Sequence, residues 1–240
     1  MPARILTALP VYNEEKHVEQ VLAHVREYAD NILVVDDGST DGTPQLLAQE
    51  ADIATIVHDP NRGYGAALVS AFEYAIREGY DALVTIDCDG QHQPQLIPDL
   101  ANRLLEDSSI DMVSGSRYLE ILDGQSPPPE DRRVINVQIT DWINKNLHLN
   151  LTDSFCGFKA YRVEALKQLR ISEFGYAMPL QLWVQAVSAG WKIVEHAVPL
   201  VYLEEERSFG GSLDDGQKRL AYYKEVLASA VDNIDRAVGC

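Results

Sequence analysis

The chain has 240 residues, of which 46% are hydrophobic and 24% charged, as in an ordinary globular protein with a sizeable buried core. The formal net charge of −17 argues against nucleic acid as a partner, because phosphate binding requires a basic face. No apolar run approaches the ~20 residues of a membrane span, no signal peptide precedes the first apolar segment, and the three cysteines form no disulfide pattern. We therefore expect a cytoplasmic protein.

The first half of the sequence alternates short apolar runs with segments of helical periodicity. Strands are predicted at residues 5–11, 32–35, 54–58, 82–86 and 112–115. Helices are predicted to begin near Asn13, Thr43, Leu68 and Pro94. Asn13 is expected to cap the first of these helices. Strands and helices that alternate at this spacing predict an α/β fold with a doubly wound, mostly parallel sheet.

The second half of the sequence is less regular. Residues 118–131 include three consecutive prolines and are predicted to form a loop, and a second loop is predicted over 204–216. Between them, apolar residues at helical spacing begin at Val134. The segment 132–147 also carries basic residues, so it is a candidate for membrane contact, although a helix with such a stripe is more often part of a core.

Acidic residues follow two of the predicted strands directly. Asp36-Asp37 and Asp87-Cys88-Asp89 should therefore both lie at the carboxyl edge of the sheet, where α/β folds bind ligands. In an extended segment, alternate side chains point to opposite faces, so one aspartate can ligate a metal while the other holds a hydroxyl or a water. A solvated turn is the alternative for each segment.

Seven motifs occur in order along the chain, and together they are specific. They are Pro10–Glu14, Val34–Gly42, Asn61–Gly65, Asp87–His92, Ser114–Tyr118, Asp153–Arg162 and Arg207–Ser212. The first four resemble the signature of family 2 glycosyltransferases with the GT-A fold. The last three resemble the branch of dolichyl-phosphate mannose synthases and polyprenyl-phosphate glycosyltransferases.

The resemblance implies a role for each matching residue. It places five residues in a nucleoside pocket, namely Pro10, Tyr12, Glu14, Val35 and Asp37. It implies that Mg²⁺ or Mn²⁺ and the donor diphosphate are held by Asp87, Asp89 and Gln91, with Cys88 among the donor-binding residues. Arg117 and Arg207 would contact phosphates, as a planar cation suits paired oxygens; a solvated surface charge is the alternative for both.

The implied reaction is transfer of a hexose, with inversion, from a nucleotide-sugar such as GDP-mannose or UDP-glucose to a polyprenyl or dolichyl phosphate. The catalytic residues would be Asp87, Asp89, Arg117 and Asp153. Asp153 is the candidate general base, with a cap or turn role as the alternative. A soluble or glycan acceptor, or a catalytically silent sugar-nucleotide-binding protein, remain alternatives. Peripheral contact with the cytoplasmic membrane face, or a membrane partner, would bring the chain to a lipid.

Two positions depart from the pattern of the mannose synthases. Leu213 stands where they typically have a lysine, so one phosphate-binding cation is missing unless Lys218 or Arg219 replaces it. Gln181 lies near a position where relatives often carry a carboxylate, which weakens the case for a base there. We expect a single domain, 1–240, with a nucleotide-sugar half (1–117), an acceptor half with loops (118–216) and a C-terminal helix (217–240).

Two other enzyme classes share parts of this pattern. A sugar-nucleotide pyrophosphorylase has a comparable scaffold and acidic site but carries a glycine-rich loop after its first strand, where this chain has Pro10–Glu14. A dinucleotide oxidoreductase needs three spaced glycines after the first strand, whereas the segment 63–68 lacks the third and follows another strand. Both classes are therefore disfavoured.

Overall fold

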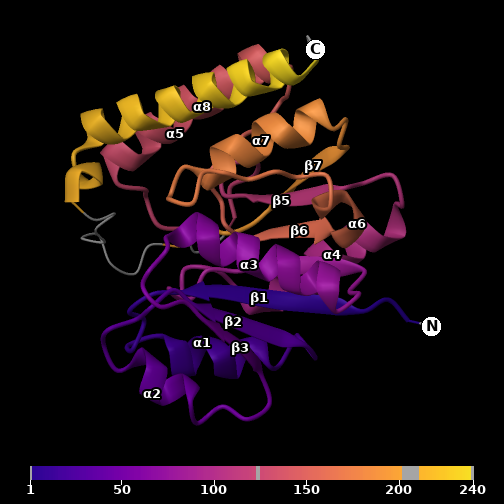
Figure 1. Ribbon diagram of the computed structural model, residues 1–240, viewed down its shortest axis with the longest axis vertical. Helices are drawn as coiled ribbons and strands as arrows, with labels where there is room; N and C mark the ends of the chain where they lie inside the picture. Colours follow the sequence, from indigo (N-terminus) through magenta and orange to yellow (C-terminus); the bar gives the residue numbers. More distant parts are fainter. Residues whose placement is uncertain (1, 123–124, 202–210, 239–240) are drawn as a thin grey trace.

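A computed structural model of the chain describes residues 2–122, 125–201 and 211–238, the last four by backbone only. Its centre is a seven-stranded sheet in the order β3-β2-β1-β4-β6-β5-β7 (Figure 1). The strands are β1 (Ile5–Val11), β2 (Ile32–Asp36), β3 (Ala54–Val57), β4 (Ala82–Thr85), β5 (Met112–Ser116), β6 (Lys159–Arg162) and β7 (Ile193–Ala197). Only β6 runs against its neighbours β4 and β5, while the other pairs are parallel. The predicted α/β fold with a mostly parallel sheet is confirmed.

Helices cover both faces of this sheet. They are α1 (Val18–Val25), α2 (Thr43–Leu47), α3 (Tyr64–Arg77), α4 (Ile97–Glu106), α5 (Glu130–Leu147), α6 (Val163–Leu166), α7 (Met178–Ser188) and α8 (Gly216–Val238). Short 3₁₀ turns, η1 (Pro94–Leu96) and η2 (Gly211–Asp214), precede α4 and α8. One core cluster joins α1, α2 and α4 to one face, and a second joins α3, α6 and α7, backed by α5 and α8, to the other. Alternate strand residues serve the two clusters, as Val34 and Val35 show.

All five predicted strands are present, and β6 and β7 are two that the periodicity did not indicate. The sequence of β6 is only four residues long and has a basic residue at each end. The strand β7 is nowhere fully buried, and its Ile-Val-Glu-His-Ala sequence shows no clean alternation. The predicted loop 118–131 ends where α5 begins at Glu130. Most of the predicted loop 204–216 lies outside the described residues.

The predicted cap at Asn13 is wrong, because α1 begins five residues later, at Val18. Asn13 has a positive φ of 56° and joins two loops at the carboxyl edge of the sheet instead. Its side-chain oxygen accepts a hydrogen bond from the Thr40 backbone N–H at 2.8 Å, and its own N–H donates to Ser39 Oγ at 2.9 Å. These bonds tie the segment after β1 to the segment after β2.

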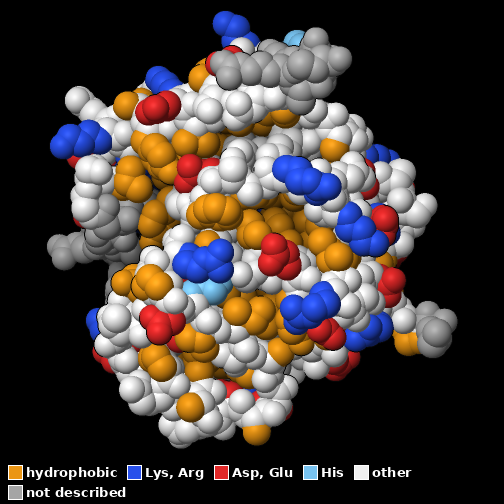
Figure 2. Space-filling view, viewed as in Figure 1, with side chains coloured by type: hydrophobic (Ala, Val, Ile, Leu, Met, Phe, Trp, Pro, Cys, Tyr) orange, Lys and Arg blue, Asp and Glu red, His pale blue; other side chains and the backbone are white. Residues whose placement is uncertain are grey.

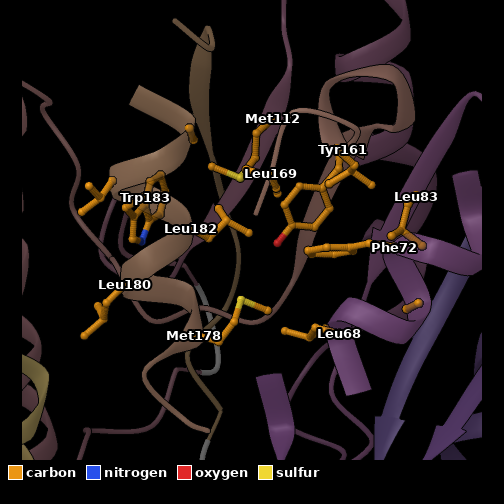
Figure 3. Packing of buried hydrophobic residues seen from close by; sticks show 14 of the residues in the cluster. Leu68, Phe72, Leu83, Met112, Tyr161, Leu169, Met178, Leu180, Leu182 and Trp183 are labelled. Carbon is orange, nitrogen blue, oxygen red and sulfur yellow. The ribbon is translucent and has the colours of Figure 1, made fainter. Parts of the chain in front are cut away.

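Close contact between α3 and the segment before α7 depends on two glycines. A Cβ on Gly65 would lie 2.5 Å from Met178 Cβ, and a Cβ on Gly63, whose φ is +103°, would overlap the Phe174 carbonyl oxygen. The Ala66 N–H donates to that same carbonyl at 3.1 Å. Further along, Leu68 and Phe72 face Met178, Leu182 and the ring of Tyr161 (Figure 3). The glycines of the motif Asn61–Gly65 are therefore required for the packing of α3 against the segment before α7.

Candidate active site at the carboxyl edge of the sheet

A cavity of about 880 Å³ opens where β1, β2, β4 and β5 end. These strands all point the same way, so the loops that follow them converge on one edge. The cavity wall includes most of the predicted site residues, namely Pro10, Tyr12, Glu14, Asp37, Asp87, Cys88, Asp89, Gln91 and Arg117. Val35 and Asp153 are not part of this wall, and Arg207 lies outside the described residues.

Asp87 is held in place by two side chains from other segments. The Tyr64 hydroxyl donates to Asp87 Oδ1 at 3.0 Å, and His92 Nε2 lies 3.2 Å from Oδ2. Burial, and then the Asp87 charge, raises the pKa of Tyr64, so its hydroxyl stays protonated and remains a donor. Gly157 closes against the same carboxylate, since a Cβ there would meet Oδ1 at 2.7 Å and lie closer still to Oδ2. A glycine is therefore required at this position.

Tyr64, His92 and Gly157 were not singled out from the sequence. Each lies inside or beside a motif that was recognised, but nothing in the motif spacing says which member touches Asp87. The spatial relationship depends on β6 lying beside β4, which brings Gly157 next to the end of β4, where the Thr85 hydroxyl donates to the Gly157 carbonyl at 2.8 Å.

The acidic triplet fits a hard divalent cation only in part. Asp87 and Asp89 offer carboxylate oxygens, and Gln91, whose backbone N–H donates to Asp89 Oδ1 at 3.0 Å, lies beside them. In the parts of the chain that the structure describes, no three or more His, Cys, Asp or Glu side chains converge as an all-protein metal site would require. The donor set therefore suits a cation that also takes oxygens from a diphosphate and from water, as Mg²⁺ commonly does.

Asp37 lines the cavity, but its carboxylate accepts hydrogen bonds from neighbouring loops. Oδ1 lies 2.6 Å from His58 Nδ1 and accepts from the Arg62 N–H, while Oδ2 accepts from the Gly63 N–H at 2.7 Å. The side chain is only 4% exposed. Its hydrogen bonds join the end of β2 to the start of α3, so the entrance to α3 is fixed relative to the cavity.

Val35 does not reach the cavity. It lies inside β2 with 0% exposure and packs among core residues below α3. Val35 is the last residue but one of β2, and its buried side chain cannot touch a nucleoside beyond the strand end. A contact through its backbone stays a prediction of the family resemblance.

Arg117, in the cavity wall, forms a bidentate pair with Asp153, which lies behind it. Arg117 Nε donates to Asp153 Oδ2 at 2.6 Å, and the guanidinium also donates to Oδ1 at 3.0 Å. Asn136 Nδ2 and the Phe155 N–H add two further hydrogen bonds to Oδ1. Burial alone would raise the pKa of Asp153, but the charge and hydrogen bonds of Arg117 hold that pKa well below its usual range.

This geometry does not support Asp153 as a general base. The carboxylate is fully buried, is not part of the cavity wall and is held by Arg117, so it has neither the access nor the proton affinity that a base needs. Its position instead fixes the guanidinium of Arg117, which does line the cavity.

The far end of the cavity is basic and aromatic rather than acidic. It is the part of the wall that α5 and α8 contribute, with Arg132 and Ile135 from α5 and Arg219 and Tyr223 from α8. These two helices lie together on the side of the molecule away from β1, β2 and β3 (Figure 1). Arg219 is only 3% exposed; its guanidinium donates to Asp131 at 2.8 Å and to the Leu213 carbonyl at 2.7 Å. Lys218 and Arg219 are the two candidates to replace the lysine that mannose synthases typically have at the position of Leu213. Of the two, Arg219 lines the cavity, whereas Lys218 is exposed and does not.

Gln181 lies outside this cavity. Its side-chain oxygen accepts hydrogen bonds from the N–H groups of Ser172 and Glu173, both at 2.9 Å, and its amide donates to the Ser172 hydroxyl. The residue therefore shapes the segment before α7. A carboxylate here would face the same backbone groups, so the absence of one says little about a base.

Comparison with known proteins places this architecture in a family. The model of Glycosyl transferase family 2 matches residues 7–170. An undecaprenyl-phosphate mannosyltransferase of Micrococcus luteus is 34% identical over 85% of this chain and 85% of its own length. A polyprenol monophosphomannose synthase of Mycolicibacterium smegmatis is 31% identical over 98% of this chain and 91% of its own length.

Solved structures agree on the fold. Glucosyl-3-phosphoglycerate synthase of Mycobacterium tuberculosis, in complex with Mg²⁺ and uridine diphosphate, superposes with a TM-score of 0.73 over 96% of this chain and 80% of its own, at 20% identity. At that identity the likeness concerns the GT-A fold alone. Together with the family match and the two curated relatives, it leads to one conclusion: the chain belongs to glycosyltransferase family 2 and has its GT-A fold.

Proposed function

We propose that the protein transfers a hexose from a nucleotide-sugar to a polyprenyl phosphate. The observation that carries this proposal is the distribution of charge on the cavity wall: the loop after β4 contributes the acidic residues Asp87 and Asp89, whereas α5 and α8 contribute Arg132 and Arg219. We call these two parts of the wall the acidic end and the basic end. A donor diphosphate with a divalent cation suits the acidic end. An acceptor phosphate suits the basic end.

At the donor end, the nucleoside would lie against the residues that follow β1, with Pro10, Tyr12 and Glu14 as its wall. Asp87, Asp89 and Gln91 would hold Mg²⁺ or Mn²⁺ together with the diphosphate. When bound, the cation would supply charge neutralisation of the leaving diphosphate. Uridine and guanosine diphosphate donors both remain candidates. Arg117, fixed by Asp153, would present a planar cation to the phosphates, and Arg207 is proposed for a similar contact.

At the acceptor end, the reaction needs no protein base. An oxygen of the acceptor phosphate, anionic near neutral pH, attacks the anomeric carbon as the bond from that carbon to the diphosphate breaks, and nucleoside diphosphate leaves. The engagement of Asp153 with Arg117 is therefore consistent with a phosphate acceptor, whereas a hydroxyl acceptor would need a group to take its proton. We expect inversion at the anomeric carbon, because direct displacement occurs once.

Apolar side chains beside the acceptor end fit a lipid. Leu119, Ile121, Val134 and Val137 are all exposed, and Ile121 is 96% exposed. The guanidinium of Arg133 lies 3.8 Å from the centre of the ring of Tyr118, which links the loop of Leu119 and Ile121 to α5. Among the described helices, none is long and apolar enough to cross a membrane. We propose that these four apolar side chains contact the surface of the membrane that holds the lipid acceptor.

The proposed division of labour follows the chain. Residues 1–117 would form the donor half, 118–216 the acceptor half, and 217–240 a C-terminal helix that completes the acceptor end. The names of the relatives support the acceptor, since one is an undecaprenyl-phosphate mannosyltransferase and the other a polyprenol monophosphomannose synthase. A third relative, the UDP-N-acetylglucosamine–dolichyl-phosphate N-acetylglucosaminyltransferase of Methanococcus voltae, is 30% identical over 69% of this chain and 72% of its own length.

A transfer assay tests the proposal. The protein is incubated with Mn²⁺ and a panel of labelled GDP- and UDP-sugars, with vesicles that contain polyprenyl phosphate or with vesicles that lack it. We expect lipid-linked hexose from at least one donor only when the lipid phosphate is present, with an anomeric configuration, read by NMR, opposite to that of the donor. Transfer to soluble glycans instead, nucleotide binding without any transfer, or retained configuration would each contradict the proposal.

A further inference from the structure

The short segment 172–176, between α6 and α7, connects the C-terminal helix to the acidic end of the cavity. It is fixed at several points along its length. Gln181 holds the N–H groups at its start, and the Phe174 carbonyl lies against the first turn of α3, where it accepts the Ala66 N–H. The segment contains the exposed ring of Tyr176 and the partly buried carboxylate of Glu173. Its two ends therefore face different parts of the molecule.

One end of the segment is joined to α8 by a carboxylate. The Tyr222 hydroxyl donates to Glu173 Oε1 at 2.6 Å, and the Gly175 N–H donates to the same oxygen at 2.8 Å. Burial, and then the hydrogen bond to Glu173, raises the pKa of Tyr222, so the hydroxyl remains a donor. A Cβ on Gly175 would lie 2.9 Å from Oε1 and 3.3 Å from the Tyr222 hydroxyl, so a larger residue there would displace the carboxylate of Glu173.

The other end of the segment is joined to Asp87 by two stacked rings. The rings of Tyr176 and Tyr64 are nearly parallel, with an interplanar angle of 14° and centroids 5.9 Å apart. The hydroxyl of Tyr64 is the group that donates to Asp87 Oδ1. A continuous set of contacts therefore runs from Tyr222 through Glu173 and Tyr176 to the acidic triplet.

Glu173 is set apart from the other members by its location. It does not line the large cavity, whereas Tyr64, Tyr176 and Tyr222 do. It lines a second, smaller cavity of about 280 Å³ between the segment and α8. Figure 2 shows hydrophobic side chains exposed on the drawn face of the molecule, below the upper edge where α8 lies in Figure 1. Any effect of Glu173 on the donor must therefore pass through neighbouring groups.

We propose that Glu173 is a positioning residue for the donor site, which fastens the segment 172–176 to Tyr222 of α8 and so holds the Tyr176–Tyr64 pair in the place that orients Asp87. This inference rests on the proposed function, because it takes Asp87 as part of the donor and metal site. It assigns α8 a role at the donor end of the cavity in addition to its contribution to the acceptor end.

Calorimetric titration of Mn²⁺ with UDP or GDP into the folded protein tests this role, because it needs no acceptor and no turnover. Glu173→Ala removes the acceptor of both hydrogen bonds, and we expect affinity for the metal–nucleotide pair to fall about tenfold, as for other losses of coupling through packed contacts. Glu173→Gln keeps an acceptor oxygen and should restore binding to within about twofold of the unaltered protein. Glu225→Ala is the matched control, since Glu225 lines the same small cavity but, among the described residues, no hydrogen bond joins it to the segment.

Unaltered metal–nucleotide affinity in a folded Glu173→Ala protein would overturn the inference, as would an equal loss in Glu225→Ala. If Glu173→Ala fails to fold, Tyr222→Phe removes the same hydrogen bond while it keeps the ring, and it should weaken binding by a similar factor. Failure of the unaltered protein to bind any nucleotide would instead contradict the proposed function itself. Steady-state kinetics provide a second measurement: the KM for the donor should rise more than kcat falls.

Discussion

The two ends of the cavity are built in different ways. The donor end is formed by residues that immediately follow β1, β2 and β4, so three neighbouring strands deliver Tyr12, Asp37 and Asp87 to one edge. The acceptor end is assembled from helix faces and a loop far apart in the sequence, with Arg132 on α5 and Arg219 on α8. The donor end therefore depends on strand order, and the acceptor end on how the helices pack over the sheet.

The largest expected effect comes from a substitution that impairs the donor end and leaves the acceptor end unchanged. Asp89→Asn removes a carboxylate from the proposed metal and diphosphate site, and we expect the rate of transfer to fall by about a thousandfold, the scale of lost Lewis-acid stabilisation. Affinity for polyprenyl phosphate should stay within about twofold, because the arginines at the other end are unchanged. Initial rates and vesicle binding measure the two quantities; a parallel loss of lipid binding would contradict the separation of the two ends.

The next effect concerns the ion pair of Arg117 with Asp153 beside the cavity. Asp153→Asn leaves the partly buried Arg117 beside a neutral amide, and we expect the free energy of unfolding at neutral pH to fall by about 3 kcal/mol. The folded pKa of Asp153 lies below its ordinary value of 3.8, so its stabilising contribution is present in full above about pH 4 and is lost as the pH falls further.

Denaturant unfolding at a series of pH values measures this contribution. The difference between the unaltered protein and Asp153→Asn should stay constant from about pH 5 to 7 and shrink below about pH 4. A pH–rate profile with an acid limb near pH 6 that disappears in Asp153→Asn would show that the carboxylate does act as a base, and it would contradict the positioning role.

A smaller effect tests the contact between β6 and the acidic triplet. Gly157→Ala places a methyl group against both oxygens of Asp87, and we expect kcat to fall about thirtyfold as the carboxylate is displaced. Gly190→Ala is the matched control, because Gly190 has a positive φ of 73° and nothing within 4 Å of an added Cβ. It should lower the melting temperature without loss of activity per folded molecule; equal losses in both variants would contradict the specific role of Gly157.

The smallest expected effect tests which cation binds the acceptor phosphate. Arg219→Gln should weaken binding of the lipid phosphate about tenfold, as one charge-assisted contact is lost, while donor binding is unchanged. Lys218→Gln, next to it on α8 but exposed, should have no effect. Vesicle co-flotation measures lipid binding by both variants, with the melting temperature as a check on folding. An effect of Lys218→Gln and none of Arg219→Gln would show that the other cation replaces the missing lysine.

The donor end of the cavity could be predicted from the sequence better than the acceptor end. Acidic residues directly after buried strands indicated the edge at which Asp87 and Asp89 would lie, since that relation is local. The pairing of Asp153 with Arg117 joins residues 36 positions apart. It depends on β6 lying between β4 and β5, which no local pattern announces. Val35 fits a motif position and Gln181 departs from the family pattern, but only packing decides which way either side chain points.

The central claim is that one cavity holds a donor at its acidic end and a lipid phosphate at its basic end at the same time. Calorimetric titration of a short-chain prenyl phosphate into protein saturated with Mn²⁺ and nucleoside diphosphate tests this directly, with the matching prenol as the comparison. We expect the phosphate to bind the saturated protein and the prenol to bind at least about tenfold more weakly. Equal affinity for phosphate and prenol, or displacement of the nucleotide by the phosphate, would contradict it.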